Sequence, residues 1–317
     1  MIVPFALDPD ALRLGDWRCL GRLAPIWALW GVLIDGTTEL EDAADQLPDG
    51  DKKRWLSLLD EKRMRRDRQP RAGLTVRQCL ERGSIRDLEL AGVQLLGLGE
   101  ESAKRLGIDL TTPPPTHRGQ IEVCSLAHLD LAKKFEKIRD EIFVPEKLST
   151  EEVWKRHFEG LAKYARQVVI FDRYAGTDAA GAPSVPTNRD YGTNGLRHFI
   201  DWLARDAQHC KSLVIYTAAV PRFRDDAVIE AIRRSCARAQ RLSVAVRLIE
   251  GDKESKFHDR YVRFDNTVLR IGCGIEVLKG RATNRRAEIS RVDKYVHESE
   301  PWETEARAAA VLYEVSS

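Results

Sequence analysis

The sequence predicts an α/β fold whose C-terminal part is a mostly parallel sheet flanked by helices. Apolar, strand-type runs at residues 168–174, 212–218 and 242–250 alternate with the helix-type segments 190–207 and 225–240. Such alternation requires helical crossovers, and these place successive strands parallel in one sheet. The helix at 190–207 supports this, because its apolar residues recur at helical spacing and mark a single buried side.

A run of three prolines predicts the boundary between two regions. Residues 111–118 read TTPPPTHR, and consecutive prolines stiffen the backbone and cannot continue a helix. We therefore divide the chain into an N-terminal region at 1–112, a linker at 113–118 and a C-terminal domain at 119–317. The apolar stretch just after the linker fits a strand of either region.

The N-terminal region is expected to be mainly helical or mixed α/β, and its sequence does not define a role. Trp27 and Trp30 lie in a segment of near-helical apolar spacing, which favours a buried core over an exposed docking surface. The basic stretch at 51–71 also carries acidic residues, so a solvated helix face is favoured over a phosphate-binding helix.

Composition excludes several classes of protein. The 317 residues are 43% hydrophobic and 32% charged with a net charge of +2, so a basic, nucleic-acid-binding surface would have to be local. No apolar run reaches the length of a membrane span and the start lacks a signal-peptide pattern, so we expect a cytoplasmic protein. The six cysteines form no CxxC pair, which favours free thiols, and we expect neither a metal site nor a cofactor.

The most informative segment is 256–280, KFHDRYVRFDNTVLRIGCGIEVLKG. It predicts a hairpin with a turn at Asp265 and Asn266, because apolar alternation precedes this pair and an apolar run follows it. His258 and Arg260 are two residues apart at the start of the first strand, so they are expected on the same face. An imidazole and a guanidinium that share a face form a candidate phosphate site.

The ordered pattern His258-x-Arg260-x4-Asp265, followed by Gly272, resembles the HxKxxxxD…G signature of the phospholipase D-like superfamily. The resemblance implies that His258 attacks a phosphodiester, that Arg260 grips phosphate oxygens, and that Asp265 orients the imidazole or stabilises the surrounding structure. Two positions depart from the signature: arginine replaces lysine at position 260, and Cys273 stands where a small hydroxyl residue is expected.

With these departures, residues 168–280 look closest to the phospholipase D-like domain that follows the MIT domain in eukaryotic MIT-domain proteins. That branch has a similar HDR-x-[IV]-R-F hairpin, an aspartate and tyrosine after the first strand, and an asparagine at the start of the next helix. The resemblance implies a lipid- and membrane-binding module and not an efficient enzyme. The supporting residues that it implies are Asp172, Tyr174, Asn194 and Glu276.

Further cations are expected near the hairpin. Ligands of parallel sheets gather where the strands end, which brings Arg173 towards the start of the hairpin. The stretch 279–291 follows the hairpin as a basic loop, interpreted either as a phosphate-binding surface or as solvated surface. Its proposed phosphate-binding residues are Lys279, Arg281, Arg285 and Arg286. Glu276 is placed where it could instead pair with Arg260.

Three hypotheses follow from these patterns. In the first, the protein is a phosphodiesterase or nuclease, by family-level analogy an effector of prokaryotic anti-phage defence. Because the chain has one signature, this hypothesis predicts a homodimer that places two His258 side chains in one site. In the second, the domain recognises phosphate on nucleic acid, anionic lipid or a partner protein without catalysis. In the third, it is a scaffold subunit that docks partner proteins through its N-terminal tryptophans. Nucleic acid is preferred to lipid because no membrane-inserting amphipathic stretch is evident.

Overall fold

The computed structural model shows an α/β protein with two compact units, Ile2–Asp140 and Glu141–Ser317. The residues that it describes are 2–14, 17–35, 38–60, 65–67, 75–110, 116–140, 142–181, 194–218, 225–236, 242–249, 260–283, 286–294, 297, 299–308 and 311–315. None of the helices in these ranges has the length and apolar character that crossing a bilayer requires.

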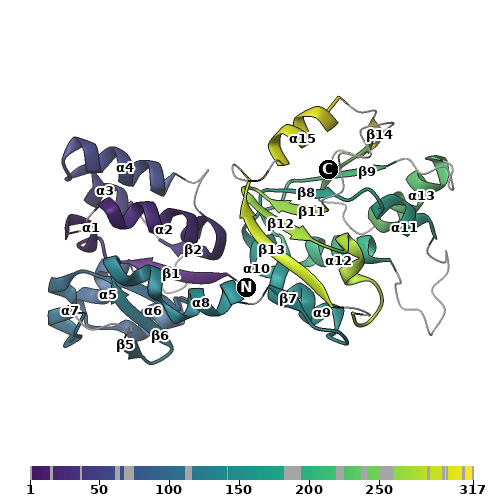
Figure 1. The fold of residues 1–317 in the computed structure, drawn as a ribbon. Coiled ribbons are helices and arrows are strands. Elements are labelled where there is room, and N and C mark those ends of the chain that lie inside the picture. The colour runs from purple at the N-terminus through teal and green to yellow at the C-terminus, as the bar shows by residue number, and fades with distance from the viewer. Residues whose placement is uncertain are drawn as a thin grey trace. The chain divides into compact units, whose positions relative to one another are not determined.

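The N-terminal unit is built on a six-stranded sheet of order β3-β2-β1-β4-β6-β5 (Figure 1). All neighbouring strands are parallel except β5, which runs antiparallel to β6. The strands are β1 Val3–Leu7, β2 Gly31–Ile34, β3 Arg66–Asp67, β4 Leu95–Leu98, β5 Thr116–Arg118 and β6 Ile121–Ser125. The region is therefore mixed α/β, which is one of the two expected alternatives.

Helices lie between the parallel strands, as their pairing requires, and further helices follow β6. They are α1 Ala11–Leu14, α2 Trp17–Trp30, α3 Glu39–Asp45, α4 Asp49–Leu59, α5 Val76–Glu81, α6 Ile85–Leu90, α7 Glu100–Leu106, the 3-10 helix η1 Leu126–Leu131 and α8 Lys133–Asp140.

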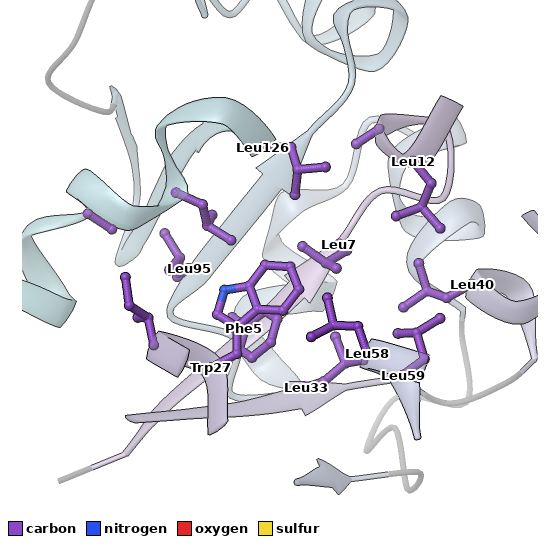
Figure 2. Close-up of a cluster of buried hydrophobic side chains, with 14 of the residues drawn as sticks. Phe5, Leu7, Leu12, Trp27, Leu33, Leu40, Leu58, Leu59, Leu95 and Leu126 are labelled. Atoms are coloured by element: carbon purple, nitrogen blue, oxygen red, sulfur yellow. The ribbon is translucent and has the colours of Figure 1, made fainter. Parts of the chain in front are cut away.

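Buried leucine side chains surround the rings of Trp27 and Phe5 in the core of the N-terminal unit (Figure 2). Trp27 is fully buried and lies 5.0 Å from the Phe5 ring and 6.4 Å from the Trp55 ring, centroid to centroid. Trp30 is partly buried and packs against the same cluster. The expectation of a tryptophan core is confirmed, and docking through Trp27 is excluded because its side chain has no exposed surface.

One arginine of the basic stretch is also buried, contrary to the predicted solvated helix face. Arg66 lies in β3 with 3% of its side chain exposed, and it pairs with Asp35 and Glu41. The two carboxylates balance the positive charge of the Arg66 guanidinium, which burial removes from water.

The C-terminal unit contains an eight-stranded sheet of order β14-β10-β9-β8-β11-β12-β13-β7 (Figure 1). The strands are β7 Phe143–Val144, β8 Gln167–Phe171, β9 Ser212–Ala218, β10 Ser243–Ile249, β11 Tyr261–Phe264, β12 Thr267–Ile271, β13 Ala287–Asp293 and β14 Val311–Val315. The predicted hairpin is confirmed as β11 and β12, which pair from Tyr261–Arg270 to Phe264–Thr267.

The prediction of a mostly parallel sheet is wrong for this unit. Only β8, β9 and β10 pair in parallel, and the other neighbouring pairs of this sheet are antiparallel. After β10, the strands β11, β12 and β13 are consecutive antiparallel neighbours, and β14 follows α15 and pairs antiparallel with β10. Part of the predicted basic loop is one of these antiparallel strands, since residues 287–293 form β13.

Helices cover both faces of this sheet. They are α9 Thr150–Val153, the π-helical turn η2 Trp154–Phe158, α10 Glu159–Tyr164, α11 Ala175–Gly181, α12 Gly195–Asp206, α13 Asp225–Cys236, the 3-10 helix η3 Gly274–Leu278 and α15 Ser299–Ala306. Tyr261 packs on Trp302 of α15, whereas Phe264 packs on Phe158 and on Phe199 of α12. Because side chains alternate along β11, α15 and α12 lie on opposite faces (Figure 1).

The boundary between the two regions lies later than the proline run suggests. Residues 116–118 and 121–125 form β5 and β6 of the N-terminal sheet, and that unit continues to Asp140. The predicted division at 113–118 is therefore wrong, and the apolar stretch after the prolines belongs to the first region. The proline run precedes an edge strand inside the unit.

Candidate functional site

The end of β8 and the start of β11 lie side by side, as the sequence predicts. Phe171, the last residue of β8, pairs with Tyr261, the first residue of the antiparallel β11. Asp172 and Arg260 are therefore neighbours at one end of the sheet. The end of β9 joins them, because Ala218 N–H donates to the Arg173 carbonyl at 3.1 Å. His258 lies outside the described residues.

Asp172 is buried at the centre of this arrangement, with 2% of its surface exposed. Its Oδ2 accepts the Ile275 backbone N–H at 2.8 Å and its Oδ1 accepts the Tyr174 backbone N–H at 3.0 Å. Burial raises the pKa of the Asp172 carboxyl, while the two backbone hydrogen bonds and the nearby Arg260 charge act in the opposite direction. Asp172 thus ties the β8 turn to the segment after β12.

A left-handed glycine lets these groups approach closely. Gly274 has φ +66°, and a Cβ atom there would lie 2.7 Å from Arg260 Cδ and closer still to Asp172 Oδ2. Other residues adopt this backbone conformation at an energetic cost, and here a side chain would also collide. Sequence reasoning did not select Gly274, although its place in Gly272-Cys273-Gly274 was a local signal for a tight turn.

The positive charge of Arg260 lies near the Asp172 carboxyl without forming an ion pair with it. Arg260 is half-buried, and its guanidinium forms neither a hydrogen bond nor an ion pair with the part of the chain that the structure describes. Its guanidinium carbon lies 4.8 Å from the centre of the Tyr174 ring, in a cation–π contact. A guanidinium has five N–H donors, and none of those of Arg260 is hydrogen-bonded to a described residue.

Arg173 reaches the same aromatic ring. Its guanidinium carbon lies 4.9 Å from the Tyr174 ring centre. The prediction that Arg173 approaches the start of the hairpin is therefore confirmed.

Asp265 lies at the opposite end of the hairpin from Arg260. It is the turn residue, with φ +49°, and its carboxylate accepts the backbone N–H groups of Arg166 and Gln167 at 3.0–3.2 Å. Arg166 and Gln167 stand at the amino end of β8, whereas Arg260 lies at its carboxyl end. Contact between Asp265 and the start of the hairpin is excluded, and its observed role is to stabilise the turn.

Asn194 and Glu276 flank the site in structural roles. Asn194 caps α12, because its Oδ1 accepts the N–H groups of Leu196 and Arg197 at 2.9 and 3.3 Å. Glu276 pairs with Lys279 at 3.4 Å and not with Arg260. The alternative prediction of an ion pair between Glu276 and Arg260 is therefore wrong.

The other predicted phosphate-binding cations are spread beyond the hairpin. Lys279 and Arg281 are exposed after η3, and Arg286 is exposed with its guanidinium carbon 4.0 Å from the Phe143 ring centre. Arg285 lies outside the described residues. Cys273 is buried, as expected of a small packing residue.

The geometry defines an α/β protein with a candidate anion site at the carboxyl ends of β8 and β9. Comparison with protein-family models and with curated protein sequences finds no match to this chain.

Proposed function

We propose that the C-terminal unit binds phosphodiesters through Arg260 and acts on them as a phosphodiesterase or nuclease of phospholipase D type. The observation that carries the proposal is the half-buried Arg260 guanidinium, which lies near Asp172 but forms no hydrogen bond or ion pair with the described residues. A guanidinium matches the oxygens of a phosphate with two parallel N–H bonds. The resemblance of the hairpin to the phospholipase D signature adds His258 as the nucleophile.

Nucleic acid is the favoured ligand. Insertion into a membrane requires exposed apolar side chains, and in the described part of the C-terminal unit the large exposed ones are Ile142 and Phe143. Arg286 lies over the Phe143 ring, which reduces the apolar surface further. The phosphate backbone of a nucleic acid requires only cations, and Arg260 supplies one at the carboxyl end of β8.

Binding is tested with a fluorescent twelve-residue oligothymidylate titrated at several salt concentrations. We expect Arg260→Ala to lower the affinity at least tenfold and to reduce the slope of log affinity against log salt by about 0.7, the value for one phosphate contact on a single strand. Arg166→Ala is the matched control, because it removes the same charge at the amino end of β8. Equal losses of oligonucleotide affinity in the two variants would show that the effect comes from general surface charge and not from the candidate site.

Catalysis is tested separately with His258→Ala. We expect the wild-type chain to cleave the oligonucleotide or an aryl phosphodiester as a homodimer, and His258→Ala to bind with wild-type affinity but to cleave at least a hundredfold more slowly. If the wild-type chain sediments as a monomer and His258→Ala turns over substrate at the wild-type rate, the hydrolase hypothesis is wrong.

The second candidate is a non-catalytic phosphate-recognition module. It is favoured by the position of Asp265, which lies at the far end of β11 and cannot orient a group beside Arg260. This candidate predicts binding that depends on Arg260, with no turnover by any variant. Vesicles containing phosphatidylserine test whether the phosphate belongs to a lipid. Tighter binding of the chain to these vesicles than to the oligonucleotide would indicate that it recognises lipid.

A further inference from the structure

An exposed aromatic ring lies on an edge strand of the C-terminal sheet. The strand order places β7 at the edge, and Phe143 of β7 is 50% exposed. Its neighbour Val144 is fully buried, because successive side chains of a strand point to opposite faces. Phe143 therefore lies outside the core, although phenylalanine is among the residues most often buried.

Backbone hydrogen bonds anchor the chain on both sides of this ring. The Ile289 N–H donates to the Ile142 carbonyl at 2.8 Å, just before Phe143. The Thr283 hydroxyl donates to the Pro145 carbonyl at 2.7 Å, just after Val144. The ring therefore projects from a backbone whose position is fixed by its neighbours in the sheet.

Arg286 lies over the Phe143 ring. Its guanidinium carbon is 4.0 Å from the ring centre, which is close to the separation of carbon atoms in van der Waals contact. Arg286 is exposed, and its guanidinium forms neither a hydrogen bond nor an ion pair with the described residues. The two side chains form a stacked pair at the surface, which we call the Phe143–Arg286 platform.

A flat, exposed guanidinium on an aromatic ring is suited to the face of a nucleobase. The bases of single strands stack on aromatic rings and on guanidinium planes, whatever the base. Glu288 pairs with Phe143 across the two strands and is exposed, so a negative charge lies beside the platform. This charge disfavours a phosphate or an anionic lipid head group at this point, but it does not oppose an uncharged base.

We propose that the Phe143–Arg286 platform binds one unpaired base of a single-stranded nucleic acid by stacking. The base lies on the guanidinium, and the ring behind it holds the guanidinium flat. This inference rests on the proposed function, because that proposal makes a single strand the ligand of this unit. It assigns a different contact to a different surface, since β12 and β13 separate β7 from β11, at whose start Arg260 lies.

The test compares the affinity of the purified full-length chain for two strands of equal charge. One is the twelve-residue oligothymidylate, and the other is an abasic strand of the same length, which has the phosphates without the bases. We expect the wild-type chain to bind oligothymidylate at least fivefold more tightly than the abasic strand. Arg286→Lys keeps the charge but lacks the planar group. It should bind oligothymidylate at least fivefold more weakly than wild type and the abasic strand within twofold of wild type.

Variants of Phe143 test the ring separately. Phe143→Ala should bind oligothymidylate at least threefold more weakly than wild type, and Phe143→Tyr should bind it within twofold of wild type because the ring is retained. Ile142→Ala is the matched control, since Ile142 adjoins Phe143 and is 36% exposed but has no aromatic ring. It is expected to bind both strands like wild type.

The outcomes distinguish stacking from charge and from loss of folding. Equal affinity of the wild-type chain for the two strands, or wild-type binding of oligothymidylate by either Arg286→Lys or Phe143→Ala, would overturn the inference. Equal losses for the two strands in these variants would also overturn it, because they would reflect charge or folding. Arg260→Ala is expected to weaken the binding of both strands alike. Wild-type binding by Arg260→Ala would overturn the proposed function, and failure of the wild-type chain to bind either strand would overturn both proposals.

Discussion

Arg263 and Glu303 form a buried ion pair between the hairpin and α15. Arg263 Nε donates to Glu303 Oε1 at 2.6 Å and Nη2 donates to Oε2 at 2.5 Å, and the two side chains are 7% and 5% exposed. Removing one partner leaves a buried charge uncompensated, which costs about 3–5 kcal/mol. We expect that loss for Glu303→Leu in chemical denaturation. Arg263→Met combined with Glu303→Leu should recover most of it, and a double variant as unstable as the single one would contradict this account.

Lowering the pH should destabilise the chain through His157. This residue is 5% exposed in the π-helical turn η2, where burial, with the charges of Arg291 and Arg156, lowers its pKa from 6.5 to about 3. Because the pKa is depressed in the folded state, the stabilisation is complete above pH 6.5. It is lost as the pH falls towards 3, by at most about 1.4 kcal/mol per pH unit.

The check is chemical denaturation at several pH values between 3 and 7. His157→Leu removes the titrating group, so its stability should fall less steeply with acidification than that of wild type. Parallel pH profiles of the two proteins would show that His157 does not titrate in this range.

Asp265→Ala should destabilise the hairpin and leave oligonucleotide affinity unchanged. The substitution leaves the Arg166 and Gln167 N–H groups without the Asp265 carboxylate, and it puts alanine at a positive φ. The expected cost is about 2–4 kcal/mol. A tenfold loss of affinity in a chain that remains folded would instead connect Asp265 to the anion site.

Gly274→Ala should damage the site more than Gly280→Ala does. Both glycines have positive φ, +66° and +78°, so each substitution carries about 1–2 kcal/mol of backbone strain. Only the Gly274 side chain would collide with Asp172 and Arg260, whereas nothing lies within 4 Å of a Cβ at Gly280. We expect thermal melting to show that Gly274→Ala lowers the free energy of unfolding by about 1–3 kcal/mol more than Gly280→Ala does. Its oligonucleotide affinity should fall, while that of Gly280→Ala should remain at the wild-type level.

Local patterns predict much of the C-terminal unit. The alternating apolar residues of β11, the Asp265–Asn266 turn and the apolar run of β12 give the hairpin, because each depends on neighbours in the chain. The sequence Ser149-x-x-Glu152 is typical of a capping box, and the structure contains one, with Ser149 Oγ accepting the Glu152 N–H at 3.2 Å.

Relationships between distant segments are not encoded in such patterns. The alternation of strands and helices suggested a parallel sheet, but the pairing of β13 and β14 is set by tertiary packing and is antiparallel. The proline run resembled a linker, although β6 returns to the N-terminal sheet beyond it. The sequence analysis identified Asp172 and Arg260 but missed Gly274. The reason is that the role of this glycine depends on the close approach of Asp172 and Arg260 in three dimensions.

The hydrogen bond from Ile275 N–H to Asp172 joins positions 103 residues apart. Closing so long a loop carries an entropic cost that contacts made earlier in folding must offset. The segment after β12 can therefore reach Asp172 only once the intervening strands have assembled. A nascent chain that has not yet emerged as far as Ile275 lacks the N–H that binds Asp172 Oδ2, so this anchor of the buried carboxylate forms only after the segment beyond β12 has been made.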